Sequence, residues 1–299
     1  NPLTSACSDK EKTMLPAHQS PFTVTDQGLS VPALTEMNSQ LGQPGQLAQL
    51  GERREVIGEW YGCKLSSVFQ PIVDPVSGRQ VGSEAFLRCH GNGQRDLSPW
   101  SLFSANASDE KLVAFDRLVR TVHTVNFRAH FEPGQLLFLN IHGRLLAAVN
   151  ADHGAYFRGT LASLGIAPEQ VVIETPTAAS HQTELLSFVL RNYRNNGFRV
   201  AVNVDSAAQW QLIASRIDPD FVKIDARAVL DGAAGGSGGL DWLHALKGDA
   251  TLVLTHLESR LGDDQLRSGT WAQGFAYGRP APRLAAPETA AANRRFLRC

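Results

Sequence analysis

From about residue 66 onward, the chain alternates short runs of β-branched or aliphatic residues with longer amphipathic stretches. This alternation indicates strands and helices in βα order. We predict eight strands, at residues 68–73, 81–87, 136–141, 171–174, 199–203, 221–224, 251–254 and 272–275. Helices are expected between them, for example at residues 110–129, 183–195 and 240–247.

Eight such units across about 230 residues suit an α/β fold, namely a TIM-type (β/α)8 barrel. A doubly wound open sheet is the alternative. It is disfavoured because no glycine-rich phosphate loop follows a predicted strand. The glycine-rich segment 232–239 lies between helical stretches and is expected to be a flexible surface loop.

The first 65 residues differ from the rest of the chain. Residues 1–45 are rich in Ser, Thr, Gln, Pro and Gly, which predicts a linker or a loosely ordered N-terminal arm. Residues 46–65 are expected to form a helix that packs on the main domain or pairs with a partner, because their apolar residues recur at helical spacing. These residues are Leu47, Leu50, Ile57 and Trp60. The barrel domain is expected to cover residues 66–290.

Composition excludes several classes of partner. With 28 basic and 29 acidic residues, the net charge is -1, so no global field attracts nucleic acid or an anionic membrane. No apolar run approaches the roughly 18 to 20 residues of a membrane span, and the start lacks the pattern of a signal peptide. The four cysteines are too widely spaced for a metal knuckle, so we expect reduced thiols and a cytoplasmic location.

Polar residues recur where the predicted strands end. In a barrel of this kind, chemistry takes place at the carboxyl ends of the strands. One such residue is more often a turn former than a ligand, but here they occur on successive strands. They are Glu84, Arg88, Asn140, Glu174, Asn203, Asp205, Lys223, Asp225 and Gln273.

Four segments carry a resemblance to a known family: residues 69–72, 84–88, 221–225 and 273–280. They are similar to the EAL family of cyclic di-GMP phosphodiesterases, whose name motif Glu-Ala-Leu stands here as Glu84-Ala85-Phe86. The resemblance covers about residues 66 to 283 and implies a barrel of the EAL kind. It also implies that Asn140 and Glu174 join Glu84 in binding divalent metals.

The chain departs from the family at two metal ligands. The family has two adjacent aspartates after the fifth strand, whereas this chain has Val202-Asn203-Val204-Asp205. The loop that follows is shorter than in the family, which leaves room for Asp205 to replace a lost ligand.

A second departure lies on the seventh strand. The family motif Glu-Gly-Val-Glu, whose first Glu activates the attacking water, is here Thr255-His256-Leu257-Glu258. Threonine is not a base near neutral pH, and loss of a general base costs roughly 10² to 10⁴ in rate. Imidazole titrates in the right range, but the strand alternation is expected to turn His256 to the other face.

The changes remove three negative charges from one small site. Two-metal hydrolysis needs several anionic oxygens around paired cations about 3.5 to 4 Å apart. We therefore expect a degenerate, inactive site that requires no cofactor. A single, weakly bound magnesium or manganese ion at Glu84, Asn140 and Glu174 is compatible with the remaining donors.

The groups that would recognise a nucleotide remain. Arg88 offers a planar set of donors for a phosphodiester, and Phe86 offers a face on which a purine can stack. The form Glu-x-Phe-Leu-Arg also resembles inactive members of the family that act as cyclic di-GMP receptors. The expected ligand-binding residues are Gln70, Glu84, Phe86, Leu87, Arg88, Asp116, Asn140, Glu174, Asp225, Gln273 and Pro280.

Several of these residues also have structural interpretations. Phe86 could be ordinary core, Asp116 a solvated carboxylate on a helix, and Arg88 a surface residue. Lys223 and Asp225 could pair with each other. The leading functional hypothesis is a cyclic di-GMP receptor that relays nucleotide occupancy to a partner domain or protein. The alternatives are a nucleotide-independent interaction module, and a residual phosphodiesterase that uses Asp205 and His256.

Overall fold

The computed structural model describes residues 24–282 apart from 26–27, 43, 51–54, 92–95, 107, 131, 133, 149–152, 177–182, 228–248 and 263–267. The loop predicted at 232–239 and the helix predicted at 240–247 lie outside the described residues, as do Cys7 and Cys299. Cys63 and Cys89 are free thiols. Within the described part, no helix combines the length and apolar character that a membrane span needs.

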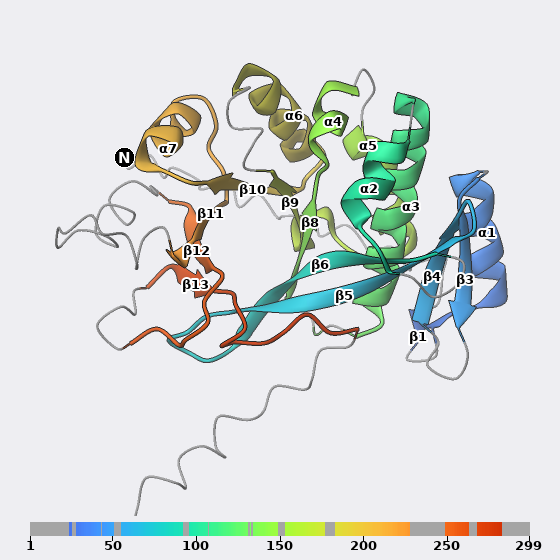
Figure 1. Ribbon diagram of the computed structural model, residues 1–299, viewed down its shortest axis with the longest axis horizontal. Coiled ribbons are helices and arrows are strands. Elements are labelled where there is room, and N and C mark those ends of the chain that lie inside the picture. The colour runs from blue at the N-terminus through green and yellow to red at the C-terminus, as the bar shows by residue number, and fades with distance from the viewer. Residues whose placement is uncertain are drawn as a thin grey trace, which may run out of the picture.

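Eight strands close into a barrel, which confirms the predicted α/β fold class (Figure 1). Six neighbouring pairs, from β6–β8 round to β12–β13, are parallel. The barrel strands are β5 (Cys63–Val73), β6 (Gln80–His90), β8 (Leu136–Asn140), β9 (Val171–Thr175), β10 (Arg199–Val204), β11 (Phe221–Asp225), β12 (Thr251–Thr255) and β13 (Thr270–Ala272).

The first barrel strand departs from the simple βα pattern. β5 is antiparallel to both of its neighbours, β6 and β13. Its connection to β6 is the short turn at residues 74–79 and contains no helix, and short turns join antiparallel strands. Strand β13 ends at Ala272 rather than at the predicted residue 275. The chain then returns along β5, where Phe69 and Ala281 exchange backbone hydrogen bonds of 2.8 and 3.0 Å.

Helices surround the barrel and cover its outer face. The longest, α3 (Asp109–Arg128), is capped by the Ser108 hydroxyl, which accepts from the Lys111 amide, and it packs against β4 and β5. The others are α2 (Pro99–Ala105), α4 (Gly143–Ala148), α5 (His153–Ser163), the 3-10 turn η1 (Pro168–Gln170), α6 (Thr183–Asn195) and α7 (Ala207–Ala214). The helix predicted at 183–195 is confirmed.

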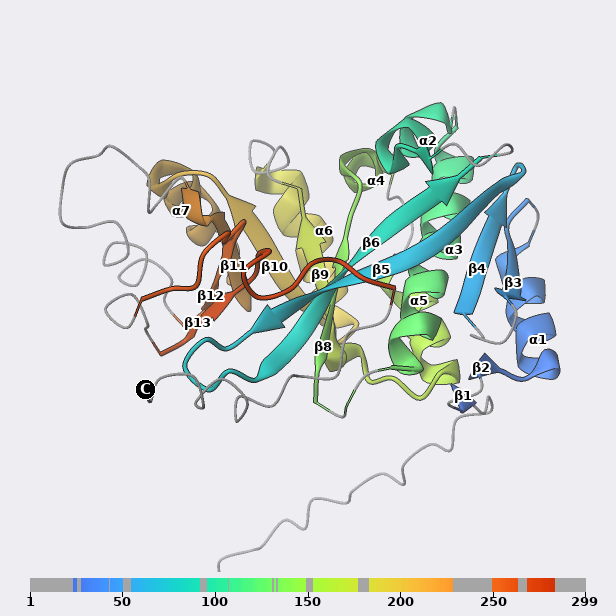
Figure 2. The ribbon, with the colours of Figure 1, turned by 60° about the horizontal axis from the view of Figure 1, so that its bottom comes forward.

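The β5–β6 hairpin extends beyond the barrel and carries an antiparallel sheet (Figure 2). Strands β3 (Gln46–Leu50) and β4 (Glu55–Trp60) add to its β5 side, and β7 (Asp96–Leu97) adds to its β6 side. Helix α1 (Val31–Leu41) contacts β3, and a small hairpin of β1 (Val24–Thr25) and β2 (Gly28–Leu29) precedes it.

Two N-terminal predictions are therefore wrong within the residues that the structure describes. The helix expected over residues 46–65 is a β-hairpin, because β4 pairs with β5 and buries Val56, Ile57 and Trp60. Tertiary pairing overrides the helical spacing of the apolar residues. The described part of the expected arm also contains an ordered helix, α1, which buries Ala33 and Met37.

Candidate functional site

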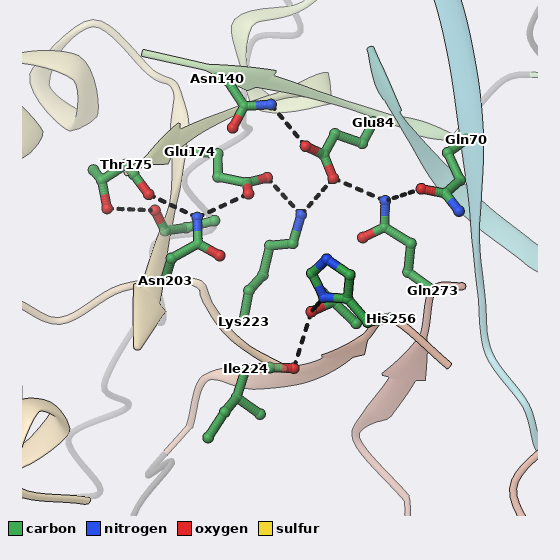
Figure 3. A network of polar contacts seen from close by, with 12 residues as sticks. Gln70, Glu84, Asn140, Glu174, Thr175, Asn203, Lys223, Ile224, His256 and Gln273 are labelled. Atoms are coloured by element: carbon green, nitrogen blue, oxygen red, sulfur yellow. Dashed lines mark hydrogen bonds and ion pairs between the residues drawn. The ribbon is translucent and has the colours of Figure 1, made fainter. Parts of the chain in front are cut away.

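A layer of polar side chains fills the mouth of the barrel, above an apolar floor. Successive inward-facing residues of a strand are two apart, so each polar residue follows an apolar one on the same face. Phe138 precedes Asn140 on β8 in this way, and Phe221 precedes Lys223 on β11. The polar layer comprises Gln70, Glu84, Asn140, Glu174, Asn203, Lys223, Thr255 and Gln273 (Figure 3).

Lys223 lies at the centre of this layer. Its Nζ donates to Glu84 Oε2 at 2.7 Å and to Glu174 Oε2 at 2.6 Å. All three side chains are buried, and Lys223 is only 1% exposed. A buried charge is costly unless it is paired and hydrogen-bonded, so Lys223 offsets part of the cost of burying the two carboxylates.

Neutral amides satisfy the remaining oxygens of the two carboxylates. Glu84 accepts from Asn140 Nδ2 at 2.7 Å and from Gln273 Nε2 at 2.8 Å. Glu174 accepts from Asn203 Nδ2 at 2.8 Å, and the same nitrogen donates to the Thr175 carbonyl at 2.7 Å. The amide at position 203 therefore acts as a donor, which an aspartate carboxylate could not do.

Two carboxylates and one ammonium leave the cluster with one excess negative charge. The pKa values of the two carboxylates therefore shift in opposite directions. Burial and the nearby Glu84 charge raise the pKa of Glu174 to about 7, against the opposing effect of Lys223. Burial also acts to raise the pKa of Glu84, but Lys223 and the amide donors outweigh it and leave that pKa lowered. The pKa of Lys223 is raised because the two carboxylates outweigh its burial. Glu174 is thus the group of the cluster that titrates near neutral pH.

Thr255 and His256 both face the cavity above this layer. The cavity has a volume of about 300 Å³, and its wall includes Lys223, Thr255, His256 and Phe86. His256 has a φ of 58°, in the left-handed region, so the strand alternation stops after Thr255. The expectation that His256 would face away is wrong for this reason. Its Nδ1 lies 3.0 Å from Thr255 Oγ1 and 3.4 Å from Asp225 Oδ2.

A second cavity, of about 220 Å³, lies beside the first. It brings together the predicted residues Phe86, Leu87, Arg88, Asp116 and Asn140. Phe86 lines both cavities. Two hollows that share one aromatic side chain in their walls suit a ligand that has two flat parts.

The comparisons with known proteins agree with this architecture. A family model described as EAL domain matches residues 60–239, which is more than half of the chain. The chain belongs to the EAL domain family. The structure of this EAL domain is similar to that of PaMucR phosphodiesterase in a cyclic di-GMP complex, with a TM-score of 0.57 at 19% identity. The match covers 73% of this chain and 92% of that one.

Two further structures are similar over most of the barrel. Klebsiella pneumoniae BlrP1 with manganese and cyclic di-GMP has a TM-score of 0.60 at 20% identity, and the match covers 83% of this chain and 65% of that one. Bacillus subtilis YkuI with cyclic di-GMP and calcium has a TM-score of 0.59 at 21% identity, with 77% and 59% covered. No curated protein matched this chain.

The donor set of this EAL domain does not fit a pair of divalent cations. Glu84 and Glu174 already accept from Lys223, and the side chains of Asn140 and Asn203 point their nitrogens at these carboxylates. In the described part of the chain, no group of three or more His, Cys, Asp or Glu side chains could bind a metal. Asp205 is exposed and lines neither cavity, so it does not replace the lost ligand. A single cation would have to displace the Lys223 ammonium.

The remaining predicted residues have mixed outcomes. Gln70 and Gln273 line the first cavity, and Gln273 Nε2 donates to Gln70 Oε1 at 3.3 Å. Pro280 is half-buried and lines neither cavity. The alternative pairing of Lys223 with Asp225 is wrong, because Asp225 bonds instead to the Arg227 guanidinium at 2.5 to 3.2 Å. That interaction lowers the pKa of Asp225.

Sequence reasoning missed one buried cation of the EAL domain. Arg120 lines the second cavity, and its Nε lies 2.6 Å from Asp116 Oδ2. Asp116 is itself buried, so its interpretation as a solvated carboxylate is wrong. The i,i+4 spacing of the two residues on one predicted helix was the signal that could have identified the pair.

Proposed function

We propose that this EAL domain binds cyclic di-GMP at the mouth of its barrel without hydrolysing it, and that it relays occupancy to a partner domain or protein. The observation that carries this proposal is the Lys223 ammonium, which bridges the carboxylates of Glu84 and Glu174. An internal cation at this point offsets one of the two negative charges without recruiting a metal, so the repulsion of a nucleotide phosphate is reduced but no metal-bound water is generated. Thr255, beside it, cannot accept a proton from water.

The two cavities support a dinucleotide as the ligand. Phe86 lines both of them and is only partly buried, so it offers an aromatic face to a base. Arg88 is exposed at the second cavity, and its guanidinium forms no ion pair within the described residues. It is therefore available to a phosphodiester oxygen pair.

The relay is proposed to run along the β5–β6 hairpin. Glu84, Phe86 and Arg88 lie on β6, which continues out of the barrel and pairs with β7. A ligand that binds one arrangement of this hairpin better than another shifts the equilibrium between them. Reduced thiols and a nucleotide messenger fit a cytoplasmic setting, with no nucleic-acid partner.

Calorimetry with cyclic di-GMP in the presence of a chelator tests this proposal. The unmodified protein is expected to bind, and Arg88→Ala to bind at least about tenfold more weakly, because a charge-assisted hydrogen bond contributes about 1.5 to 3 kcal/mol. Arg79→Ala is the matched control, because Arg79 is also exposed but precedes β6 at the opposite end of the barrel. It should bind like the unmodified protein. No heat from the unmodified protein would overturn the receptor proposal in favour of a nucleotide-independent interaction module.

Thermal unfolding gives an independent measure of the same binding. A ligand at 100 times its dissociation constant stabilises the folded state by about 2.7 kcal/mol. An interaction module that has lost the nucleotide site would show no shift at any concentration.

A residual phosphodiesterase is the second candidate, and the position of His256 favours it. The imidazole lines the cavity, and Asp225 lies 3.4 Å away on the side of Nδ1, where it can orient the ring. His256 would then accept the proton of an attacking water. Linear pGpG formed with magnesium or manganese, and lost in His256→Ala, would support this candidate. Absence of product with both metals would eliminate it.

A further inference from the structure

A third cavity, of about 300 Å³, lies at the opposite end of the barrel from the polar layer. Its wall is built where β6, β8 and β10 begin, and it shares no lining residue with the other two cavities. On β10 the inward-facing residues are Arg199, Ala201 and Asn203, because such residues are two apart. Asn203 belongs to the polar layer and Ala201 to the apolar floor, so Arg199 lies on the far side of that floor. The third cavity is therefore a separate site.

Two unpaired arginines line this third cavity. Arg79 precedes β6 and Arg199 begins β10, and both residues are exposed. Neither guanidinium has a hydrogen bond or an ion pair to another residue that the structure describes. The described wall holds one carboxylate, that of Glu132, and it forms no ion pair with either arginine. Two guanidinium groups and one carboxylate leave one excess positive charge, which favours an anion.

Neutral groups complete the wall. Gln135 Oε1 accepts from the Glu132 amide at 3.4 Å, and the Nε2 group of Gln135 has no acceptor among the described residues. The Trp271 indole is half-buried and lies 5.2 Å from the Phe221 ring, so it belongs to the barrel core and also lines the cavity. An indole at this place offers apolar surface to the carbon skeleton of a ligand.

We propose that the third cavity binds a small organic oxyanion, with its phosphate or carboxylate group at Arg79 and Arg199 and its carbon skeleton against Trp271. The planar fork of a guanidinium matches the oxygen pair of either group. Two like charges at one cavity repel each other, and an anion between them offsets that repulsion. The volume is at the lower end of the range for small-molecule sites, so the ligand is small.

Calorimetry of the full chain with two probes tests this proposal. Ribose 5-phosphate carries a phosphate group and citrate carries carboxylates, so the tighter binder identifies the group that the cavity prefers. At least one probe should bind, and its affinity should fall as potassium chloride is added, because salt screens exposed charges. Arg79→Gln and Arg199→Gln should each weaken that binding by at least about tenfold, which is the usual loss for a hydrogen bond to a charged group.

Arg158→Gln is the matched control. Arg158 is exposed on α5 and lines none of the three cavities, so this variant should bind the probe like the unmodified protein. Circular dichroism of all the variants shows that they are folded, which is expected because the three arginines are exposed.

Trp271 locates the ligand independently of the arginines. Binding of the probe should change the tryptophan fluorescence of the unmodified protein. Trp271→Phe should lose this change while calorimetry still detects the probe, because phenylalanine keeps an apolar ring at the cavity.

The outcomes separate this inference from the proposed function. No heat from either probe would overturn the inference. Equal weakening by Arg158→Gln and Arg79→Gln would show general attraction of anions to exposed arginines, and a fluorescence change that persists in Trp271→Phe would place the ligand elsewhere; either result would overturn it. Absence of cyclic di-GMP binding, with the probe still bound, would overturn the proposed function and leave this inference intact.

Discussion

The ammonium of Lys223 lies 2.6 Å from the carboxylate of Glu174, and both side chains are buried at the mouth of the barrel. Glu84 completes the cluster from the opposite side. Removing one partner of a buried ion pair leaves an uncompensated charge and is strongly destabilising. The stability of this barrel should therefore depend on Lys223.

Lys223→Met is expected to lower the free energy of unfolding by about 3 to 5 kcal/mol, because two carboxylates lose their cation. Urea unfolding followed by circular dichroism measures the change. Lys64→Met is the matched control, since Lys64 is exposed on β5. It should change stability by less than about 0.5 kcal/mol. A similar, small effect for both variants would show that Lys223 does not hold the cluster together.

Stability should vary with pH through Glu174, whose pKa is raised to about 7 from 4.5. The folded state takes up this proton at higher pH than the unfolded state does. The contribution of Glu174 to the free energy of unfolding is therefore fully present below pH 4.5 and is lost as the pH rises through about 7. The loss is on the order of 3 kcal/mol, at about 1.4 kcal/mol for each pH unit of the shift.

Glu174→Gln isolates this contribution. Burial lowers the pKa of His123 to about 3, and that shift has the opposite effect on stability over an overlapping pH range. His123 is present in both proteins, so the difference between them cancels its effect. The stability of the unmodified protein relative to the variant should fall between pH 4.5 and 7. A difference that is flat across this range would contradict the raised pKa.

Gly274 is expected to be irreplaceable in the cavity wall. A Cβ at this position would lie 2.1 Å from the Leu257 carbonyl oxygen and 2.3 Å from its backbone nitrogen. Gly274→Ala should therefore lower the free energy of unfolding by about 1 to 3 kcal/mol, which is the usual cost of overpacking. Gly159→Ala is a control of opposite sign, because Gly159 is exposed within α5 with nothing within 4 Å of its added Cβ.

Gly159→Ala should stabilise by about 0.5 to 1 kcal/mol through the higher helix propensity of alanine. Thermal unfolding of the two variants, measured side by side, should show a destabilised Gly274→Ala and a stabilised Gly159→Ala. A stability of Gly274→Ala equal to that of the unmodified protein would mean that Gly274 and Leu257 lie farther apart than the structure places them.

The barrel strands were predictable because their periodicity is strong. Strands β8 to β12 lie within one or two residues of their predicted bounds, since each is a short apolar run bounded by polar residues. The polar layer was predictable for the same reason, because Asn140 and Lys223 follow apolar residues at a spacing of two. The hydrogen-bond partners of these residues were not predictable, since Lys223 bonds to residues 139 and 49 positions away in sequence.

Other features depend on geometry that no periodicity records. The side to which His256 points follows from its left-handed backbone, which is uncommon for a residue other than glycine. The β3–β4 hairpin depends on the edge of β5, to which β4 pairs, rather than on local propensity. Asn203 appeared in the sequence only as a lost metal ligand, whereas the structure gives its amide two acceptors.

Calorimetry of cyclic di-GMP binding with and without manganese tests most directly whether Lys223 stands in for a metal. The dissociation constant should be the same in excess chelator and in excess manganese, because the internal ammonium already occupies the space between Glu84 and Glu174. A requirement for manganese, with no binding in chelator, would contradict the role given to Lys223.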